Sequence, residues 1–435
     1  MADPVSVLVV DDSALMRNLV SKIVEATPGL TVADRAMNGR FALDKIPRCD
    51  PDVIVLDIEM PEMNGIEFLK ERKRLGIEVP VVILSSVAKK GAQVTMEALA
   101  LGASDFITKP SGSVSSDIHT VAGDLARLLL AYGTEYRRHK GKAVTRYEFE
   151  APERFFEPAP VLEERAAAKA KVVAPVPPKP VRQPGPIEIV AIGISTGGPN
   201  ALREVFARID ADLPQPVLVV QHMPPGFTEE FAASLDRICP LDVKEAADGD
   251  IVKPGRVLIA PGDRHLLVER KPLGVVARLS EAPPVNGHRP SADVLFESVA
   301  KAYANRAMGV IMTGMGRDGA RELGSIFREG GLTLGQDEAS SVVYGMPKAA
   351  FEMGTSASRS GWPTWRRRSA GWPSSTGFPS PRAGSRDPAG PAGGAWLSVQ
   401  GRGRLAWGSA TSAGVAGRPG RSRRERSPRS AAERR

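Results

Sequence analysis

Short apolar runs alternate with helical patterns over the first 125 residues of the chain. The runs VSVLVV, DVIVLD and VPVVILSS are rich in β-branched residues, and each ends at polar side chains. The segments LMRNLVSKIVEA and IEFLKERKRLG have the apolar spacing of helices with one buried face. This β-α-β-α order predicts an α/β domain over residues 1–125, in which helices cover both faces of a parallel sheet.

A second α/β pattern follows an interruption. The first pattern dissolves near Tyr132, and the chain then becomes rich in charge, Ala and Pro until VVAPVPPKPVRQPGP, so we assign residues 126–186 to a semi-extended linker. Apolar runs return from Glu188 as IEIVAIGIS, QPVLVVQH, GRVLIAPG and MGVIMTG, several of them followed by helical segments. We therefore predict a second α/β domain over residues 187–354.

The composition changes abruptly beyond Gly354. Residues 355–435 contain 16 Arg, no Lys and 3 acidic residues, together with all five tryptophans of the chain. The segment is rich in Gly, Ser and Pro and has no hydrophobic period, so we expect a disordered basic tail. A natural core would be expected to share the tryptophans, which makes translation from a shifted reading frame the sharper hypothesis.

The net charge of +8 comes from that tail, because the remaining 354 residues carry a net charge of −5. The basic character is therefore a weak sign of nucleic-acid binding. Cys49 and Cys239 are too few for a disulfide framework and form no CxxC pair. The N-terminal residues show no signal core, and no apolar run approaches the roughly 20 residues that span a bilayer. We expect a cytoplasmic protein without membrane insertion.

Polar side chains gather at the predicted strand ends of the first domain. Asp11 and Asp12 follow the first strand, Asp57 ends the strand DVIVLD, Ser85 follows VVIL, and Lys109 precedes a proline. Each alone is more often a turn or surface residue, but parallel strands bring their carboxyl ends to one edge. Three crowded carboxylates favour Mg²⁺, and Asp57 could then accept a phosphoryl group whose oxygens contact Lys109 and Ser85.

These residues resemble a known family. DD at 11–12, LDIEMPEMNG around Asp57, SS at 85–86 and KP at 109–110 are similar to the receiver domains of two-component response regulators. The resemblance implies a flavodoxin-like fold, Mg²⁺ bound by the three aspartates, and phosphorylation of Asp57 by a histidine kinase. It also implies a cis peptide bond before Pro110.

The second domain carries a glycine-rich turn between a strand and a helix. In GISTG, a serine, Ser195, stands where a dinucleotide-binding turn needs glycine, so a dinucleotide site is a weak interpretation. The flanking glycines instead permit a sharp turn that exposes the Ser195 hydroxyl. Pro199 suits the first turn of the following helix.

A base and an acid for this hydroxyl follow other strands. His222 ends PVLVVQH, and Asp318 lies in the turn of VIMTGMGRDGAREL. Taken singly, His222 is more often a packing or capping residue, and Asp318 is more often a cap for the helix after it. Together, Ser195, His222 and Asp318 form a candidate Ser-His-Asp triad, with backbone N–H groups near Thr196 or Met315 to hold an oxyanion.

The second domain also resembles a known family. AIGISTGGP, VVQHMPPGFT, IAPGDRH, HRPSADVLF, TGMGRDGA and QDEASSVVYGMPKAA are similar to the catalytic domain of the CheB family, the chemotaxis protein-glutamate methylesterases. The resemblance implies a doubly wound parallel-sheet esterase domain with that triad and no cofactor. It implies methyl-accepting chemotaxis receptors as substrates and a chemotaxis histidine kinase as phosphodonor. It also implies glutamine deamidation and a receiver that packs over the triad until Asp57 is phosphorylated; we expect a monomer.

One departure and three alternatives remain at this stage. The family pattern continues after YGMPKAAFEMG with a short apolar strand and a helix, which the Arg-rich tail does not supply. A receiver-controlled serine hydrolase could act on another ester. A DNA-binding response regulator could use the basic tail, although no helix-turn-helix segment is visible. The chain could also be a signalling scaffold without catalysis.

Overall fold

The computed structural model describes residues 3–85, 89–109, 118–143, 180, 182–356, 395–399 and 405–409. Among these residues, no helix is long and apolar enough to cross a membrane. The predicted cis bond before Pro110 lies outside the described residues, as do most of the predicted linker and tail.

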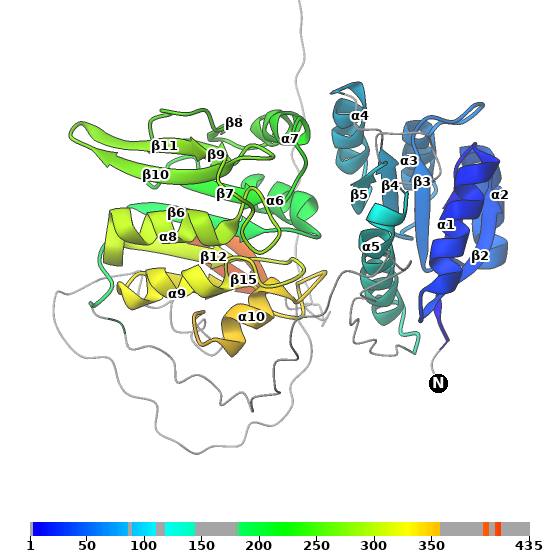
Figure 1. Cartoon of the computed structure of the whole chain (residues 1–435). Helices are drawn as coiled ribbons and strands as arrows, with labels where there is room; N and C mark the ends of the chain where they lie inside the picture. The colour runs from blue at the N-terminus through cyan, green and yellow to red at the C-terminus, as the bar shows by residue number, and fades with distance from the viewer. Residues whose placement is uncertain are drawn as a thin grey trace, which may run out of the picture.

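The first domain is a parallel sheet in the strand order β2-β1-β3-β4-β5, which confirms the flavodoxin-like prediction. Helices α1 and α5 pack on one face, where Val7 and Val9 point, and α2, α3 and α4 pack on the other, where Leu8 and Val10 point (Figure 1). The elements are β1 Val5–Val10, α1 Ala14–Ala26, β2 Leu30–Ala36, α2 Gly39–Cys49, β3 Val53–Asp57, α3 Gly65–Arg74, β4 Val81–Ser85, α4 Lys89–Ala100, β5 Asp105–Thr108 and α5 Ile118–His139.

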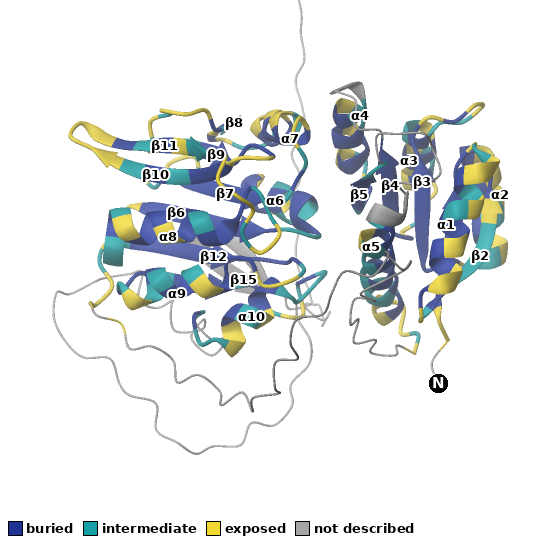
Figure 2. Ribbon diagram, viewed as in Figure 1, coloured by how far each residue is buried: buried dark blue, intermediate teal, exposed yellow. Residues whose placement is uncertain are grey.

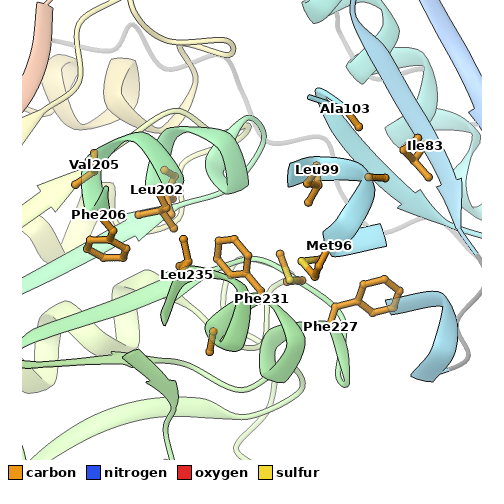
Figure 3. Close-up of a cluster of buried hydrophobic side chains, with 14 of the residues drawn as sticks. Ile83, Met96, Leu99, Ala103, Leu202, Val205, Phe206, Phe227, Phe231 and Leu235 are labelled. Carbon is orange, nitrogen blue, oxygen red and sulfur yellow. The ribbon is translucent and has the colours of Figure 1, made fainter. Parts of the chain in front are cut away.

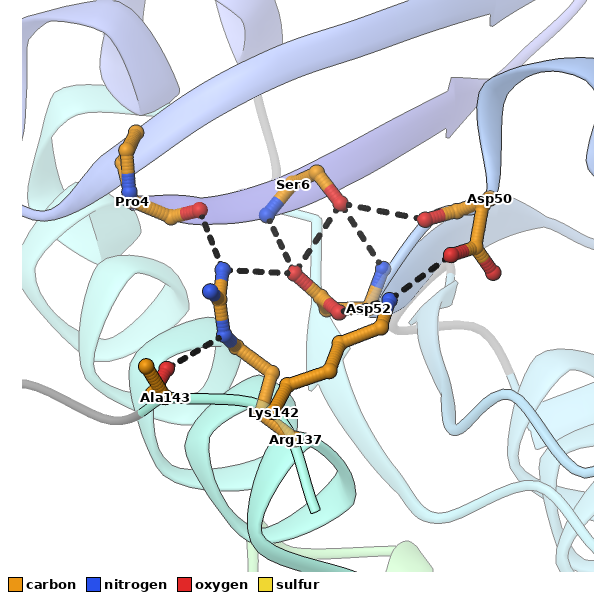
Figure 4. A network of polar contacts seen from close by, with 7 residues as sticks. All are labelled: Pro4, Ser6, Asp50, Asp52, Arg137, Lys142 and Ala143. Carbon is orange, nitrogen blue, oxygen red and sulfur yellow. Dashed lines mark hydrogen bonds and ion pairs between the residues drawn. The ribbon is translucent and has the colours of Figure 1, made fainter. Parts of the chain in front are cut away.

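Helix α5 runs past residue 125, where the sequence pattern suggested that the domain ends. Leu129 and Tyr132 are buried against the sheet. At the end of the helix, Arg137 donates to the carbonyl of Pro4 at 2.7 Å and to Asp52 Oδ2 at 3.2 Å (Figure 4). The prediction that the linker starts at residue 126 is therefore wrong, because α5 continues to His139. The charged residues on the exposed face of this helix resemble the charged composition of a linker.

The second domain contains a six-stranded sheet in the order β13-β12-β6-β7-β9-β8, and every pair in it is parallel. Strands β10 and β11 form a separate antiparallel hairpin. The elements are β6 Ile189–Ile194, α6 Gly198–Phe206, β7 Val217–Gln221, α7 Phe227–Asp236, β8 Asp242–Glu245, β9 Arg256–Ile259, β10 His265–Lys271, β11 Gly274–Ser280, α8 Ala292–Tyr303, η1 Ala304–Arg306, β12 Ala307–Ile311, α9 Ala320–Arg328, β13 Leu332–Gly335 and α10 Met346–Glu352.

Helices cover both faces of this sheet, as expected for a doubly wound fold. Ile189 and Ala191 of β6 pack with α8 and α9, whereas Val190 and Ile192 pack with α6 and α7. Figure 2 shows the result as buried strands between helices whose outer surfaces are exposed. Successive strand residues therefore serve opposite core layers, which is why the strand sequences are apolar throughout.

The Arg-rich tail contains two short described strands, β14 Ala395–Val399 and β15 Leu405–Ser409. They pair antiparallel with each other and do not join the six-stranded sheet. The prediction of a tail without structure is contradicted for these ten residues. The remaining tail residues beyond Ser356 lie outside the described part of the chain.

The two domains share an apolar contact layer. Phe227 and Phe231 of α7 lie in the same buried cluster as Met96 and Leu99 of α4 (Figure 3). The rings of Phe106 and Phe227 are stacked with their centroids 5.0 Å apart. The edge strand β5 and helix α4 of the first domain therefore face α7, the helix that follows β7.

Candidate active site and phosphorylation site

The acidic cluster lies where the strand order of the first sheet reverses, between β1 and β3. One carboxylate oxygen from each of Asp11, Asp12 and Asp57 lies within 4.8 Å of the other two. The Asp11 carboxylate accepts from the backbone N–H of Ser13 at 2.9 Å, and Ser13 caps α1, so local helix geometry fixes the first aspartate. This donor set of two buried carboxylates and one exposed carboxylate fits a hard divalent cation.

Lys109 reaches the cluster from the end of β5. Its Nζ lies 2.9 Å from Asp57 Oδ1 and 3.2 Å from Asp11 Oδ2. Burial raises the pKa of Asp57 to about 6; Lys109 opposes this shift, and Asp11 adds to it. The carboxylate is thus held in a site that disfavours its charge, and bound cations offset that penalty.

Ser85 is buried at the end of β4, at the same edge of the sheet. Its hydroxyl lies 2.5 Å from Thr95 Oγ1 and also donates to the carbonyl of Gly91 at 3.3 Å. Its carbonyl accepts from the N–H of Lys109 at 2.6 Å. The strand end therefore ties Ser85 to both α4 and Lys109.

In the second domain, Ser195 follows β6, and its N–H donates to the carbonyl of Thr313 at 3.0 Å. Gly197 has φ +77° and is the N-cap of helix α6, as the sharp turn requires. A Cβ on Gly198 would lie 1.8 Å from Gln221 Oε1. The turn therefore leaves no room for a side chain at Gly197 or Gly198.

His222 and Asp318 follow the two strands that flank β6. His222 Nε2 lies 2.9 Å from Asp318 Oδ2. Asp318 also accepts from Ser291 Oγ at 2.6 Å, from the N–H of Ala292 at 2.6 Å and from Asn286 Nδ2 at 2.9 Å. Burial alone would raise the pKa of Asp318, but hydrogen bonds and the charge of His222 outweigh it and hold the pKa well below its usual range.

The alternative of Asp318 as a cap for its own helix is wrong. Gly319 is the N-cap of α9, which has no side-chain cap. The Asp318 carboxylate instead accepts from the first N–H of α8, a helix that comes earlier in the chain. It thus orients His222 while it sits at the positive end of another helix.

The other imidazole nitrogen is also informative. His222 Nδ1 is buried and has no hydrogen-bond partner among the described residues. Because Nε2 faces a carboxylate, it carries the proton of a neutral ring, and Nδ1 is then the acceptor. Ser195 and His222 line one cavity, but no hydrogen bond between their side chains is recorded within the described chain.

That cavity has a volume of about 400 Å³ and draws its walls from both domains. Thr196, Met315, His288 and Gln221 line it from the second domain, and Asp124 and Arg127 of α5 are among the lining residues from the first. The five residues predicted for the ester site are thus brought to one cavity: Ser195, His222, Asp318 through its bond to His222, Thr196 and Met315.

Sequence reasoning missed several supporting residues. Gln221 Nε2 donates to the carbonyls of Ser195 and His222, both at 3.0 Å. Asn286 and Ser291 bind Asp318, and the His288 ring stacks on His222. The segment HRPSADVLF was noticeable as a motif, but nothing in its spacing indicated which strand end it contacts.

The fold and site define a response regulator in which a receiver precedes an α/β enzyme domain. The family model for the CheB methylesterase matches residues 190–360, and that for the response regulator receiver domain matches residues 7–118. The protein-glutamate methylesterase/protein-glutamine glutaminase of Treponema denticola is 61% identical over 352 residues, which cover 81% of this chain and 94% of that protein. The chain belongs to the CheB methylesterase family.

Two further similar proteins are the following. The protein of the same name from Treponema pallidum is 53% identical over 374 residues, which cover 80% of this chain and 92% of that protein. A crystal structure of the Thermotoga maritima CheB methylesterase catalytic domain is 42% identical, with a TM-score of 0.39; it covers 39% of this chain and 90% of that chain.

Proposed function

We propose that this chain hydrolyses glutamate methyl esters on methyl-accepting chemoreceptors, with release of methanol, and deamidates receptor glutamines to glutamates. The relatives' names support protein glutamate methyl esters and protein glutamines as the substrate groups. The observation that carries the chemistry is the 2.9 Å contact between His222 Nε2 and Asp318 Oδ2 beside Ser195. Ester and amide hydrolysis then use the same nucleophile, base and acid.

The roles follow from the hydrogen bonds. His222 Nδ1 takes the proton of Ser195 Oγ while the oxygen bonds to the acyl carbon of the glutamyl side chain. The imidazolium then gives that proton to the leaving methoxy oxygen or amide nitrogen, so methanol or ammonia departs and an acyl-serine remains. Water, deprotonated by the same nitrogen, adds to the acyl carbon. The imidazolium then returns the proton to the Ser195 oxygen as the acyl–oxygen bond breaks, and the glutamate product is released. Asp318 stays ionised throughout and stabilises the imidazolium.

The oxyanion that forms needs hydrogen-bond donors. Thr196 and Met315 line the cavity, and no acceptor is recorded for either backbone N–H among the described residues. Two such donors fit the place where negative charge develops. Losing one donor in a site of this type costs about 100- to 1,000-fold in rate.

We propose that Asp57 accepts the phosphoryl group of a chemotaxis histidine kinase and that Asp11, Asp12 and Asp57 hold Mg²⁺. The cation, when bound, neutralises the phosphoryl oxygens. Lys109, which already contacts Asp57, supplies a second positive charge at the same oxygens. Ser85 would reach the group by exchanging its bond to Thr95.

The receiver controls access to the ester site in this proposal. The cavity that contains Ser195 is partly walled by α5 and β5, and α4 packs on α7. A receptor helix could enter only after these surfaces separate, so phosphorylation raises activity by loosening the contact. The protein works in the cytoplasm on this proposal, which suits its two free cysteines.

The decisive experiment is methanol release from methylated receptor by the full chain and by its Ser195→Ala variant, with and without a small phosphodonor and Mg²⁺. We expect release by the wild type only, increased by the phosphodonor. Hydrolysis of a simple aryl ester without methanol release from receptors would favour the rival serine hydrolase. Equal methanol release by Ser195→Ala would refute the mechanism.

A further inference from the structure

A second histidine lies against the proposed base. The His288 ring is stacked on the His222 ring, with centroids 3.8 Å apart and planes 9° apart. His288 lies in the loop between β11 and α8 and lines the same cavity. No role has been given to it in the proposed hydrolysis.

Hydrogen bonds close the loop that carries His288. The N–H of His288 donates to the carbonyl of Val285 at 2.9 Å, and the N–H of Val285 donates back at 3.0 Å. Asn286 and Gly287, between them, adopt left-handed conformations with φ +52° and +79°. Asn286 Nδ2 also bonds Asp318 Oδ1 at 2.9 Å. The stacked ring is therefore fixed relative to the carboxylate that holds His222.

The hydrogen bond to Asp318 does not by itself fix the plane of His222. It holds one nitrogen, and the ring can still tilt about that contact, because Nδ1 has no partner. A tilt would move Nδ1 away from the serine oxygen. A ring lying parallel at 3.8 Å supplies the second constraint.

The charge state of the pair also matters. The charged groups that act on His288 come from three places: His222 after β7, Asp318 before α9 and Asp124 on α5, and Arg127 of α5 lines the same cavity. Burial and then the charge of His222 lower the pKa of His288 to about 4, against the opposing effect of the two aspartates. His288 is thus neutral near pH 7 and presents an uncharged ring face.

We propose that His288 is a positioning residue for the ester reaction: its neutral ring fixes the plane of His222 and faces the imidazolium that forms there. This inference rests on the proposed function. It gives the HRPSADVLF segment a role beyond helix packing. An imidazolium is stabilised by an uncharged π face and destabilised by a second cation at this distance.

The test compares His288→Ala, His288→Phe and His288→Lys in the full chain, with the exposed His139→Ala as control. We expect His288→Ala to lower kcat about 10- to 100-fold with little change in KM, because the base is misplaced. His288→Phe keeps a flat ring, so we expect its kcat to stay close to that of the wild type. A wild-type kcat for His288→Ala, or equal losses for Ala and Phe, would overturn the proposal.

A measurement without turnover separates this idea from the ester reaction itself. The His222 imidazole is titrated by NMR in histidine-labelled full chain. We expect His288→Lys to lower the pKa of His222 by about one to three units, and His288→Phe and His139→Ala to leave it within half a unit or so. An unchanged His222 pKa in the Lys variant would refute the stacking role, whereas failure of the wild type to hydrolyse any ester would refute only the proposed function.

Discussion

A carboxylate of the receiver caps the turn that carries the proposed nucleophile: Asp105 Oδ2 accepts from the backbone N–H of Gly197 at 3.0 Å. Gly197 lies two residues after Ser195, at the start of α6. Tyr132 donates to the same carboxylate at 3.1 Å, and Asn200 donates to the carbonyls of Ala103 and Ser104. The contact between the two domains therefore includes a direct hydrogen bond to the turn that carries Ser195.

Docking of the receiver should weaken as pH rises. Burial raises the pKa of Asp105, and bonds from Gly197, Phe106 and Tyr132 only partly offset it. The docked state therefore binds this proton more tightly than the open state, so the stabilisation is complete at low pH and is lost as pH rises through the raised pKa. The basal esterase rate of the unphosphorylated chain, corrected for the pH dependence of phosphorylated protein, should increase over that range.

The matched variant is Asp105→Asn, which keeps an acceptor for Gly197 without the buried charge. Its corrected basal rate should be lower than that of the wild type. The rate should also no longer rise over the pH range in which Asp105 ionises in the wild type. Glu71→Gln, at a partly exposed position on α3 where the side chain pairs with Arg74, is the control. A pH response identical to that of the wild type in Asp105→Asn would show that another group controls docking.

The apolar side of the contact gives a second prediction. Phe106→Ala removes the ring stacked on Phe227 and should raise the basal rate of unphosphorylated protein, while the fully phosphorylated rate stays unchanged. The stacked pair contributes about 0.5–1.5 kcal/mol beyond its buried area, so a several-fold rise is expected. Methanol release measures it. Phe41→Ala, at an exposed position on α2, should leave the basal rate as it was.

Asp318→Asn should separate stability from catalysis. An amide facing Nε2 favours the wrong tautomer of His222, so kcat should fall about 10⁴-fold while the fold is retained. The carboxylate pKa is depressed in the folded chain, so its stabilisation is present above the ordinary pKa and fades as pH falls toward the depressed value. Urea unfolding should therefore show that the wild type exceeds Asp318→Asn in free energy of unfolding by more at pH 7 than at pH 3. The same difference at both pH values would contradict an ionised Asp318.

Gly198→Ala should disturb both reacting residues through Gln221. The new methyl group would displace the Gln221 side chain, whose Nε2 binds the carbonyls of Ser195 and His222. We expect a destabilisation of about 1–3 kcal/mol and a lower kcat. Gly123→Ala on α5, where the added carbon meets only Arg127 Nη2 at 3.8 Å, is the comparison. Equal unfolding free energies and equal kcat values for the two variants would show that the close approach of Gln221 to Gly198 does not matter for stability or catalysis.

Much of the candidate site could be predicted from the sequence because its residues lie at strand ends. Asp57 and Ser195 are at or just beyond the ends of apolar runs, and a parallel sheet brings such ends to one edge by its topology alone. The order β12-β6-β7 then makes Asp318, Ser195 and His222 neighbours although the chain separates them. The alternation of apolar runs and helical patterns was enough to predict the two parallel α/β sheets and seven of their strands, but not the β10–β11 hairpin.

What the sequence determined by itself was local: alternating apolar runs, turn glycines and the side chain at each strand end, because these depend on neighbours along the chain. Tertiary structure decided that Asp318 accepts from α8 rather than capping α9, that α5 continues to His139, and that His288 lies flat on His222. Each of these depends on contacts between distant segments, whose packing geometry no periodicity encodes.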